Sequence, residues 1–282
     1  MGWLRVEIGV VIPNMPPYCD ASLLREVAEI IDASQVGYLF IWDHYSLPWS
    51  DETLDAWVAL SYLASLTGRV KLGTCVSPVP FRHPAALAKV VASLDVLSGG
   101  RAVLGVGAGW HKPEFTGFAY WYGDGERVSR TIEGVRIIKE LWRSGRLNFR
   151  GRYYTVQDAV VLPRPVQDTG PKILFGTTGD RMLRAAARLG DGWIPTMTPP
   201  RVYASIREKL LNLIRLNNRD AEGFIFAYAD FDIHDNTDDY IKVIEKHSNV
   251  GCRLYAATWR YGKEEAIKKL KDFIRDVVPS FS

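Results

Sequence analysis

The residues best suited to move a proton stand together in the segment Trp42-Asp43-His44-Tyr45, which follows the apolar run Tyr38 to Ile41. A histidine titrates near neutral pH and can act as a general acid or base. A single histidine in such a place is more often structural than catalytic, but the carboxylate beside it and the preceding indole favour a role in chemistry. We therefore predict that His44 and Asp43 are catalytic residues.

A second candidate site is the segment Gly176-Thr177-Thr178-Gly179, which separates the apolar run Lys172 to Phe175 from a segment of helical period. Glycine lets a backbone approach a ligand closely, and the free N–H groups and dipole of a helix N-terminus favour an anion. These features are typical of a phosphate site. A turn in which a threonine or Asp180 caps the following helix has the same composition, so both interpretations stay open.

Two other segments have a weaker claim to chemistry. His111 is a second candidate histidine, because it follows the apolar run Ala102 to Gly107. The glycines of Gly105 to Gly109 do not have the GxGxxG spacing followed directly by a helix, and they do not occupy the first strand-to-helix turn. We interpret them as close backbone packing at the end of a strand.

The elements that must position these residues alternate along the chain. Short runs rich in β-branched residues are followed by longer segments of helical period, a pattern typical of a parallel sheet built from βαβ units. The predicted strands are Val6 to Ile12, Tyr38 to Trp42, Lys71 to Val76, Ala102 to Gly107, Lys172 to Gly176, Gly192 to Ile194, Phe224 to Ala229 and Arg253 to Ala257. The predicted helices are Ser22 to Ala33, Asp55 to Thr67, Pro84 to Leu97, Arg127 to Trp142, Arg181 to Leu189, Arg201 to Leu216, Asp238 to His247 and Glu264 to Asp276.

Eight such units predict a (β/α)8 TIM barrel, with residues 1–282 as a single domain. Residues 145–167 break the alternation: Phe149 to Tyr153 resembles a hairpin and Leu162 to Pro165 an extended segment, so we interpret 145–167 as an insertion between units four and five. Sites in such barrels form in the loops after the strands. His44 and Thr177 are therefore expected at the same mouth.

Charge and cysteine content exclude several classes of protein. Lys plus Arg total 35 and Asp plus Glu total 32, for a net charge of +3 without a long run of like charges, so we expect no nucleic-acid or membrane-surface partner. Cys19, Cys75 and Cys252 lie far apart without a CxxC pair, which predicts neither a disulfide framework nor a metal site. With no long apolar stretch, we expect a soluble, unprocessed, cytoplasmic protein.

These segments together resemble the luciferase-like monooxygenase superfamily, particularly its branch that depends on coenzyme F420, a deazaflavin. The resemblance covers the first two thirds of the chain in the family's order, and its most specific part is Ser98-Gly99-Gly100-Arg101. The similar stretches are Trp42 to Tyr45, Arg82 to Pro84, Ala88-Lys89, Leu94 to Arg101, Gly105 to Trp110, Arg127 with Glu133, Gly176 to Arg181, Ala185-Ala186 and Gly190 to Trp193.

The resemblance implies a bacterial-luciferase-like barrel with a tricyclic ring in its mouth. It implies that His44 and Asp43 face the reactive edge of the ring, with Cys75 and Val76 behind it and a cis peptide bond between these two residues. It further implies that Gly109 and Trp110 contact the cofactor. The cofactor's phosphate is expected to bind at Gly176, Thr177, Thr178 and Gly179. Trp110 stands where deazaflavin members often have an acidic residue, which leaves Glu114 or His111 as the proton donor.

The resemblance implies an F420-dependent oxidoreductase that transfers a hydride between the deazaflavin and a small organic substrate, and it implies a homodimer. The tryptophans Trp42, Trp49, Trp110, Trp121 and Trp193 favour an apolar substrate. One alternative is an FMN-dependent monooxygenase served by a separate flavin reductase. Another is a flavin-binding barrel without catalytic activity. A sugar-phosphate barrel enzyme is disfavoured, because no glycine-rich turn follows the last two strands.

Overall fold

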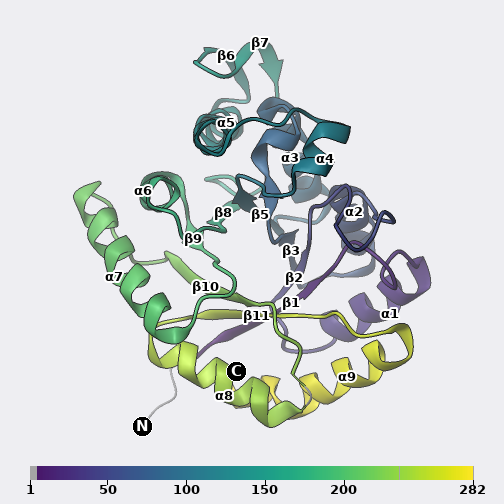
Figure 1. Cartoon of the computed structure of the whole chain (residues 1–282). Coiled ribbons are helices and arrows are strands. Elements are labelled where there is room, and N and C mark those ends of the chain that lie inside the picture. Colours follow the sequence, from purple (N-terminus) through teal and green to yellow (C-terminus); the bar gives the residue numbers. More distant parts are fainter. Residues whose placement is uncertain (1–4, 235, 282) are drawn as a thin grey trace.

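A ring of parallel strands forms the centre of the computed structural model, which describes residues 5–234 and 236–281 (Figure 1). The strands of this ring are β1 (Glu7–Ile12), β2 (Tyr38–Ile41), β3 (Lys71–Thr74), β4 (Ser77–Pro78), β5 (Ala102–Gly107), β8 (Lys172–Phe175), β9 (Gly192–Trp193), β10 (Ile225–Asp230) and β11 (Leu254–Thr258). They are ordered β3-β2-β1-β11-β10-β9-β8-β5-β4, and β3 pairs again with β5, which closes the ring. The predicted (β/α)8 TIM barrel is confirmed.

Helices surround the ring of strands (Figure 1). They are α1 (Ala21–Asp32), α2 (Ala56–Leu66), α3 (Pro84–Leu97), α4 (Lys112–Phe118), α5 (Asp124–Ser144), α6 (Asp180–Leu189), α7 (Pro200–Leu216), α8 (Thr237–Asn249) and α9 (Lys263–Asp276), with short 3-10 turns at η1 (Val79–Phe81) and η2 (Val278–Ser280). All of them except α4 correspond to the eight predicted helices.

The ends of several helices follow from local chemistry. The Asp55 side chain accepts hydrogen bonds from the backbone N–H groups of Trp57 and Val58 and so caps α2. Helix α3 has the predicted bounds and ends before Gly99 and Gly100, whose positive φ values of 68° and 88° favour glycine. Helix α5 begins before the predicted Arg127, because acidic residues in its first turn stabilise an earlier start.

The sequence pattern does not predict α4, which lies between β5 and α5. Its seven residues are too few to show a helical period, and Gly117 lowers its helix propensity. Pro113 suits the first turn of a helix. The buried residues of α4 are Glu114 and Phe115, so this helix places a buried carboxylate near the C-terminal ends of the strands.

The predicted insertion, residues 145–167, contains an antiparallel hairpin of β6 (Arg146–Arg150) and β7 (Thr155–Val160), which lies outside the ring of strands (Figure 1). The Glu133 carboxylate of α5 accepts hydrogen bonds from the backbone N–H groups of Arg152, Tyr153 and Tyr154 and so holds the turn of the hairpin. The hairpin is attached to the barrel through α5. Our interpretation of the segment as an insertion within one domain stays a prediction.

Side chains fill the lower part of the barrel, so a ligand has room only at the mouth. A separate, larger apolar cluster packs between the strands and the helices. The inward-facing cluster includes Val11, Tyr38, Phe40, Val103, Leu174, Ala227 and Leu254. A Cβ atom on Gly105 would lie 2.0 Å from the carbonyl oxygen of Thr74, which agrees with close backbone packing by this glycine. Across the described residues, no helix has the length and apolarity needed to cross a membrane.

Candidate active site

A cavity of about 610 Å³ opens at the C-terminal ends of the strands, which is a typical volume for a cofactor or substrate site. Almost every strand of the ring contributes to its wall, through the residue that ends the strand or the loop that follows. The lining residues are Trp42, His44, Leu47, Trp49, Cys75, Val76, Pro78, Gly107, Ala108, Gly109, Trp110, Gly176, Thr177, Thr178, Ile194, Pro195, Thr196, Met197, Phe231 and Arg260.

Most of the predicted site residues line this one cavity. They are His44, Cys75, Val76, Gly109, Trp110, Gly176, Thr177 and Thr178. Asp43 and Gly179, which we also predicted, and the second candidate histidine, His111, are not among the lining residues. The mouth therefore brings together residues from β2, β3, β5 and β8 that lie far apart in the sequence.

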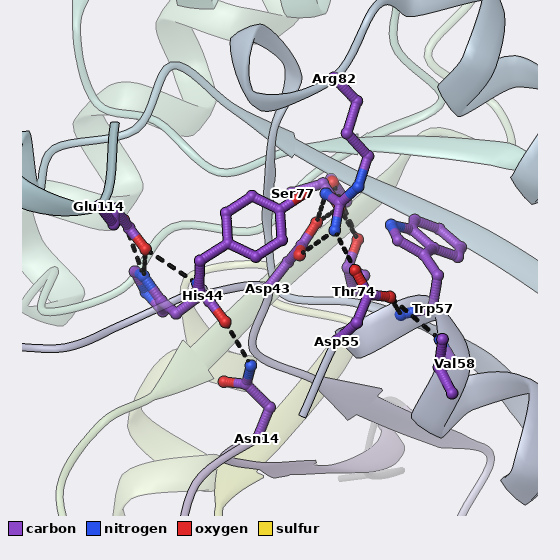
Figure 2. A network of polar contacts seen from close by, with 12 residues as sticks. Asn14, Asp43, His44, Asp55, Trp57, Val58, Thr74, Ser77, Arg82 and Glu114 are labelled. Atoms are coloured by element: carbon purple, nitrogen blue, oxygen red, sulfur yellow. Dashed lines mark hydrogen bonds and ion pairs between the residues drawn. The ribbon is translucent and has the colours of Figure 1, made fainter. Parts of the chain in front are cut away.

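His44 is paired with Glu114, the buried carboxylate of α4 (Figure 2). The Nδ1 atom of His44 lies 3.0 Å from Oε1 and 3.1 Å from Oε2 of Glu114. The same carboxylate accepts a hydrogen bond from the backbone N–H of Tyr45 at 3.1 Å. A carboxylate in this place accepts a hydrogen bond from Nδ1–H, so in the neutral imidazole Nε2 is the unprotonated nitrogen that can act as a base. Within residues 5–234 and 236–281, Nε2 of His44 has no hydrogen-bond partner.

The backbone of His44 is also fixed. The side-chain amide of Asn14, just beyond β1, donates hydrogen bonds to the carbonyl oxygens of His44 at 2.6 Å and Leu54 at 2.7 Å (Figure 2). These bonds tie the loop after β2 to the start of the chain. His44 is therefore held at both its imidazole and its main chain, as a group that transfers protons requires.

Asp43 faces away from the cavity and forms a buried ion pair with Arg82 (Figure 2). Its oxygens lie 2.6 and 2.9 Å from the two terminal guanidinium nitrogens, and Ser77 donates a third hydrogen bond. Arg82 also pairs with Asp55, the cap of α2, at 2.8 Å. Burial alone would lower the pKa of Arg82, but Asp43, together with Tyr45 and Asp55, outweighs burial and raises the pKa above its usual value.

This geometry corrects our prediction that Asp43 faces the reactive edge of a bound ring. Trp42 and His44 line the cavity, whereas Asp43 between them points to the other side, an alternation typical of an extended backbone. Asp43 instead joins the loop after β2 to η1 and to the start of α2 through Arg82. We now assign it a positioning role, in which it supports the segment that holds His44.

Val76 packs against the ends of β5 and β8 and forms part of the cavity wall. The peptide bond between Cys75 and Val76 is cis, as predicted. A Cβ atom on Gly107 or Gly176 would lie 2.8 Å from a methyl group of Val76. Gly176 is therefore required by the packing of Val76. Its expected contact with a ligand stays a prediction. Burial raises the pKa of the Cys75 thiol to about 12, so this cavity residue stays neutral at physiological pH.

The segment after β8 leaves backbone donors unoccupied at the start of α6. Gly179 is the N-cap residue of α6, and among the described residues no side chain caps the first turn of this helix. The Thr177 hydroxyl accepts a hydrogen bond of 3.2 Å from the backbone N–H of Gly179 itself. Asp180 pairs with Lys209, and the Arg181 side chain bonds to Gly125 and Ser129 of α5. The free N–H groups of the first turn suit an anion that reaches them past Thr177 and Thr178.

Aromatic side chains dominate the rim of the cavity. The Trp42 ring stacks on Phe231, with centroids 5.1 Å apart and an interplanar angle of 5°. Trp49 and Trp110 lie 6.5 Å apart and are 57% and 55% exposed, unusually high fractions for indole rings. We expected Trp121 and Trp193 to contribute to an apolar substrate site, and this expectation is wrong, because neither residue lines the cavity. Trp193 is fully buried and donates to the carbonyl oxygen of Thr177.

Sequence reasoning missed several residues of the site, among them Phe231 and Arg260, which line the cavity, and Arg82, which binds Asp43 behind the wall. Arg82 belongs to one of the stretches that carry the family resemblance. Its contact with Asp43 could not be deduced from the positions of the two residues in the sequence. Phe231 directly follows β10, and Arg260 is the second residue after β11. The rule that sites form after strands could therefore have identified both. Glu114 was considered only as a proton donor, whereas the structure pairs it with His44.

Comparisons with known proteins agree with this fold. The family model described as luciferase-like monooxygenase matches residues 7–251. An F420-dependent glucose-6-phosphate dehydrogenase of Microbacterium testaceum is 39% identical over 186 residues, covering 64% of this chain and 54% of the relative. The pyrimidine monooxygenase RutA of Variovorax paradoxus is 27% identical over 273 residues, covering 92% of this chain and 70% of the relative.

Among solved structures, an F420-dependent secondary alcohol dehydrogenase in complex with an F420-acetone adduct has a TM-score of 0.83 at 17% sequence identity, covering 99% of this chain and 100% of that chain. This similarity concerns the fold. The chain spans about half the length of the curated F420-dependent relatives that it matches.

Proposed function

The chain belongs to the luciferase-like monooxygenase family, and we propose that it is an oxidoreductase that uses coenzyme F420 to transfer a hydride to or from a small organic substrate. One observation carries the proposal: His44, which is paired with Glu114, and Thr177-Thr178, which lead to an uncapped helix N-terminus, line a single cavity. The pair suits proton transfer, and the helix N-terminus suits the phosphate of a coenzyme. Relatives named as F420-dependent support the choice of coenzyme.

The residues present fit a flat ring with a phosphate tail. Val76 and Pro78 offer an apolar surface, and Thr177 and Thr178 line the path to the free N–H groups of α6. The aromatic rim would cover the ring from solvent. When bound, the deazaflavin would supply the hydride chemistry at its C5 atom, and the protein would supply orientation and proton transfer.

In this proposal His44 is the catalytic base. Glu114 holds the Nδ1 proton, so Nε2 is the nitrogen that accepts the proton of a substrate hydroxyl, or returns it to a carbonyl oxygen in the reverse direction. Glu114 is a positioning residue that fixes the ring and its tautomer. The aromatic rings around the mouth would exclude water and favour an apolar substrate.

An FMN-dependent monooxygenase with a separate flavin reductase is the second candidate. The RutA relative favours it, since the match extends over 92% of this chain, whereas the F420-dependent dehydrogenase match extends over 64%. Fluorescence titration of the purified protein with F420 and with FMN separates the two. We expect tighter binding of F420, and tighter binding of FMN with oxygen consumption on adding reduced flavin would contradict the proposal.

A flavin-binding barrel without activity would bind F420 yet turn over no substrate, so a panel of secondary alcohols and carbonyl compounds tests that alternative. We further propose that the protein is a homodimer, which the family resemblance supports. We also propose a cytoplasmic location, which the free cysteines Cys19, Cys75 and Cys252 support. Sedimentation that gives only monomer at micromolar concentration would contradict the dimer.

A further inference from the structure

Arg260 is a cation at the rim of the cavity, directly after β11 and Trp259. In the ring of strands β11 is followed by β10, β9 and β8, so Arg260 lies three strands away from the Thr177-Thr178 segment, across much of the mouth. An anion bound at the start of α6 would therefore occupy a different side of the cavity from an anion bound at Arg260.

The guanidinium group of Arg260 is held in place while part of it stays free. Its Nη2 atom donates a hydrogen bond of 2.7 Å to the carbonyl oxygen of Phe231, and its central carbon lies 5.9 Å from the Phe231 ring centroid. Phe231 in turn stacks on Trp42. Arg260 forms no ion pair with any of the described residues, 5–234 and 236–281. Its Nε and Nη1 atoms have no hydrogen-bond partner among these residues.

The positive charge of Arg260 is not neutralised by any other described residue that lines the cavity. Among the described lining residues Arg260 is the one permanent cation, and none is an aspartate or glutamate. The carboxylates of Glu114 and Asp43 are buried behind the wall and bound to His44 and Arg82. Asp230, which precedes Phe231, is also buried, and its carboxylate is bonded to His234 and Tyr255. Asp232, which follows Phe231, is exposed and does not line the cavity. A planar guanidinium with free donors recognises a carboxylate better than a neutral oxygen.

We propose that Arg260 is a specificity-determining residue that binds a carboxylate group of the substrate, whose apolar body packs against Trp42, Phe231 and the exposed indole rings. The proposal deepens the proposed function and rests on it, because it describes the substrate of the same cavity. The substrate class is thus an amphipathic hydroxy or oxo acid with an aromatic or other apolar body.

The test compares two probes of the same apolar shape, 2-naphthoate and 2-naphthylmethanol, by calorimetric titration of the purified protein with and without F420. We expect wild type to bind naphthoate about tenfold more tightly than the alcohol, the size of one charge-assisted contact. Arg260→Gln should remove the preference, and Arg260→Lys should keep part of it. Added salt should weaken the preference of the wild type, because the cation is exposed.

The matched control is Arg146→Gln, which removes an exposed arginine of the hairpin and should leave the preference unchanged. Equal binding of the two probes by wild type, or an unchanged preference in Arg260→Gln, would overturn the proposal. So would weaker F420 binding in Arg260→Gln with the naphthoate preference intact, because Arg260 would then serve the coenzyme. Failure of F420 to bind, with the preference present in the cofactor-free protein, would refute the proposed function alone.

Discussion

The Nδ1 atom of His44 lies 3.0 Å from Oε1 of Glu114, although the two residues are 70 positions apart in the chain. Glu114 reaches this place because α4 follows β5 and turns its buried face toward the loop after β2. The pair has the arrangement of a base oriented by a carboxylate, in which the second nitrogen of the imidazole serves the substrate. It is the centre of the proposed chemistry.

The first prediction concerns this pair. His44→Ala should lower kcat by about 10²-fold or more, because the proton then has no acceptor in the cavity. Glu114→Gln should lower kcat less, since the amide oxygen can still accept a hydrogen bond from Nδ1 of His44 but the bond is no longer assisted by a charge. Steady-state assays of F420 turnover on a substrate from the panel measure both. An unchanged rate for His44→Ala at full coenzyme occupancy would assign His44 a structural role.

The ion pair of Asp43 and Arg82 leads to a prediction about stability. The side chains are 1% and 14% exposed, so removing one partner leaves a largely buried charge. Arg82→Leu should lower the free energy of unfolding by about 3–5 kcal/mol, and the double variant with Asp43→Leu should be less destabilised than the sum of the single variants. Urea unfolding measures the effect, with Arg146→Leu on the exposed hairpin as control. A loss no larger than that of the control would contradict a structural role.

Gly176 and Val76 provide a test of the cavity wall. Gly176→Ala places a Cβ atom 2.8 Å from a methyl group of Val76 and should destabilise the protein by about 1–3 kcal/mol. Because the clash is with a side chain, adding Val76→Ala should recover part of this loss. Thermal unfolding of the single and double variants decides the matter. No recovery in the double variant would mean that another contact requires glycine at this position.

The eight-unit barrel could be predicted because every strand is short, apolar and followed by a segment of helical period. Helix α4 could not be predicted, because seven residues with a proline and a glycine carry no period. Its absence from the prediction hid the partner of His44. Local pattern was enough for elements, but Glu114 reaches His44 only through tertiary packing.

The same limit explains the site. His44, Val76 and Thr177 could be predicted because they follow strands, where the fold itself forms a mouth. The role of Asp43 could not, since adjacency in sequence says nothing of the side to which each side chain points until the geometry of the loop is known. Arg260 lies in the last third of the chain, where we recognised only the barrel pattern.

The anion site that we propose at the start of α6 predicts a charge effect on coenzyme binding. Thr178 is exposed and lines the cavity next to the uncapped helix. Thr178→Glu places a negative charge beside the proposed phosphate and should raise the Kd of F420 by tenfold or more, through repulsion and competition for the same N–H groups. Fluorescence titration measures the Kd, and Thr155→Glu on exposed β7 is the control. Equal affinities in the two variants would place the phosphate elsewhere.

The last prediction is a dependence of stability on pH that comes from Asp32, the final residue of α1. Its carboxylate accepts hydrogen bonds from the backbone N–H groups of Gly68, Arg69 and Val70 at 2.8 to 2.9 Å and so joins α1 to the start of β3. Burial alone would raise its pKa, but the three donors outweigh burial and hold the pKa below the usual 3.8.

A carboxyl group with a lower pKa in the folded state stabilises the protein fully above the pKa of the unfolded chain, and this contribution is lost as the pH falls through the folded value. Asp32→Asn should therefore lower the free energy of unfolding by roughly 1.5–3 kcal/mol at neutral pH, the range of a hydrogen bond to a charged group. The difference from wild type should shrink as the pH falls below 3.8. Urea unfolding at a series of pH values measures it, with exposed Asp168→Asn as control. A difference that stays constant with pH would mean that the ionised form of Asp32 does not stabilise the fold.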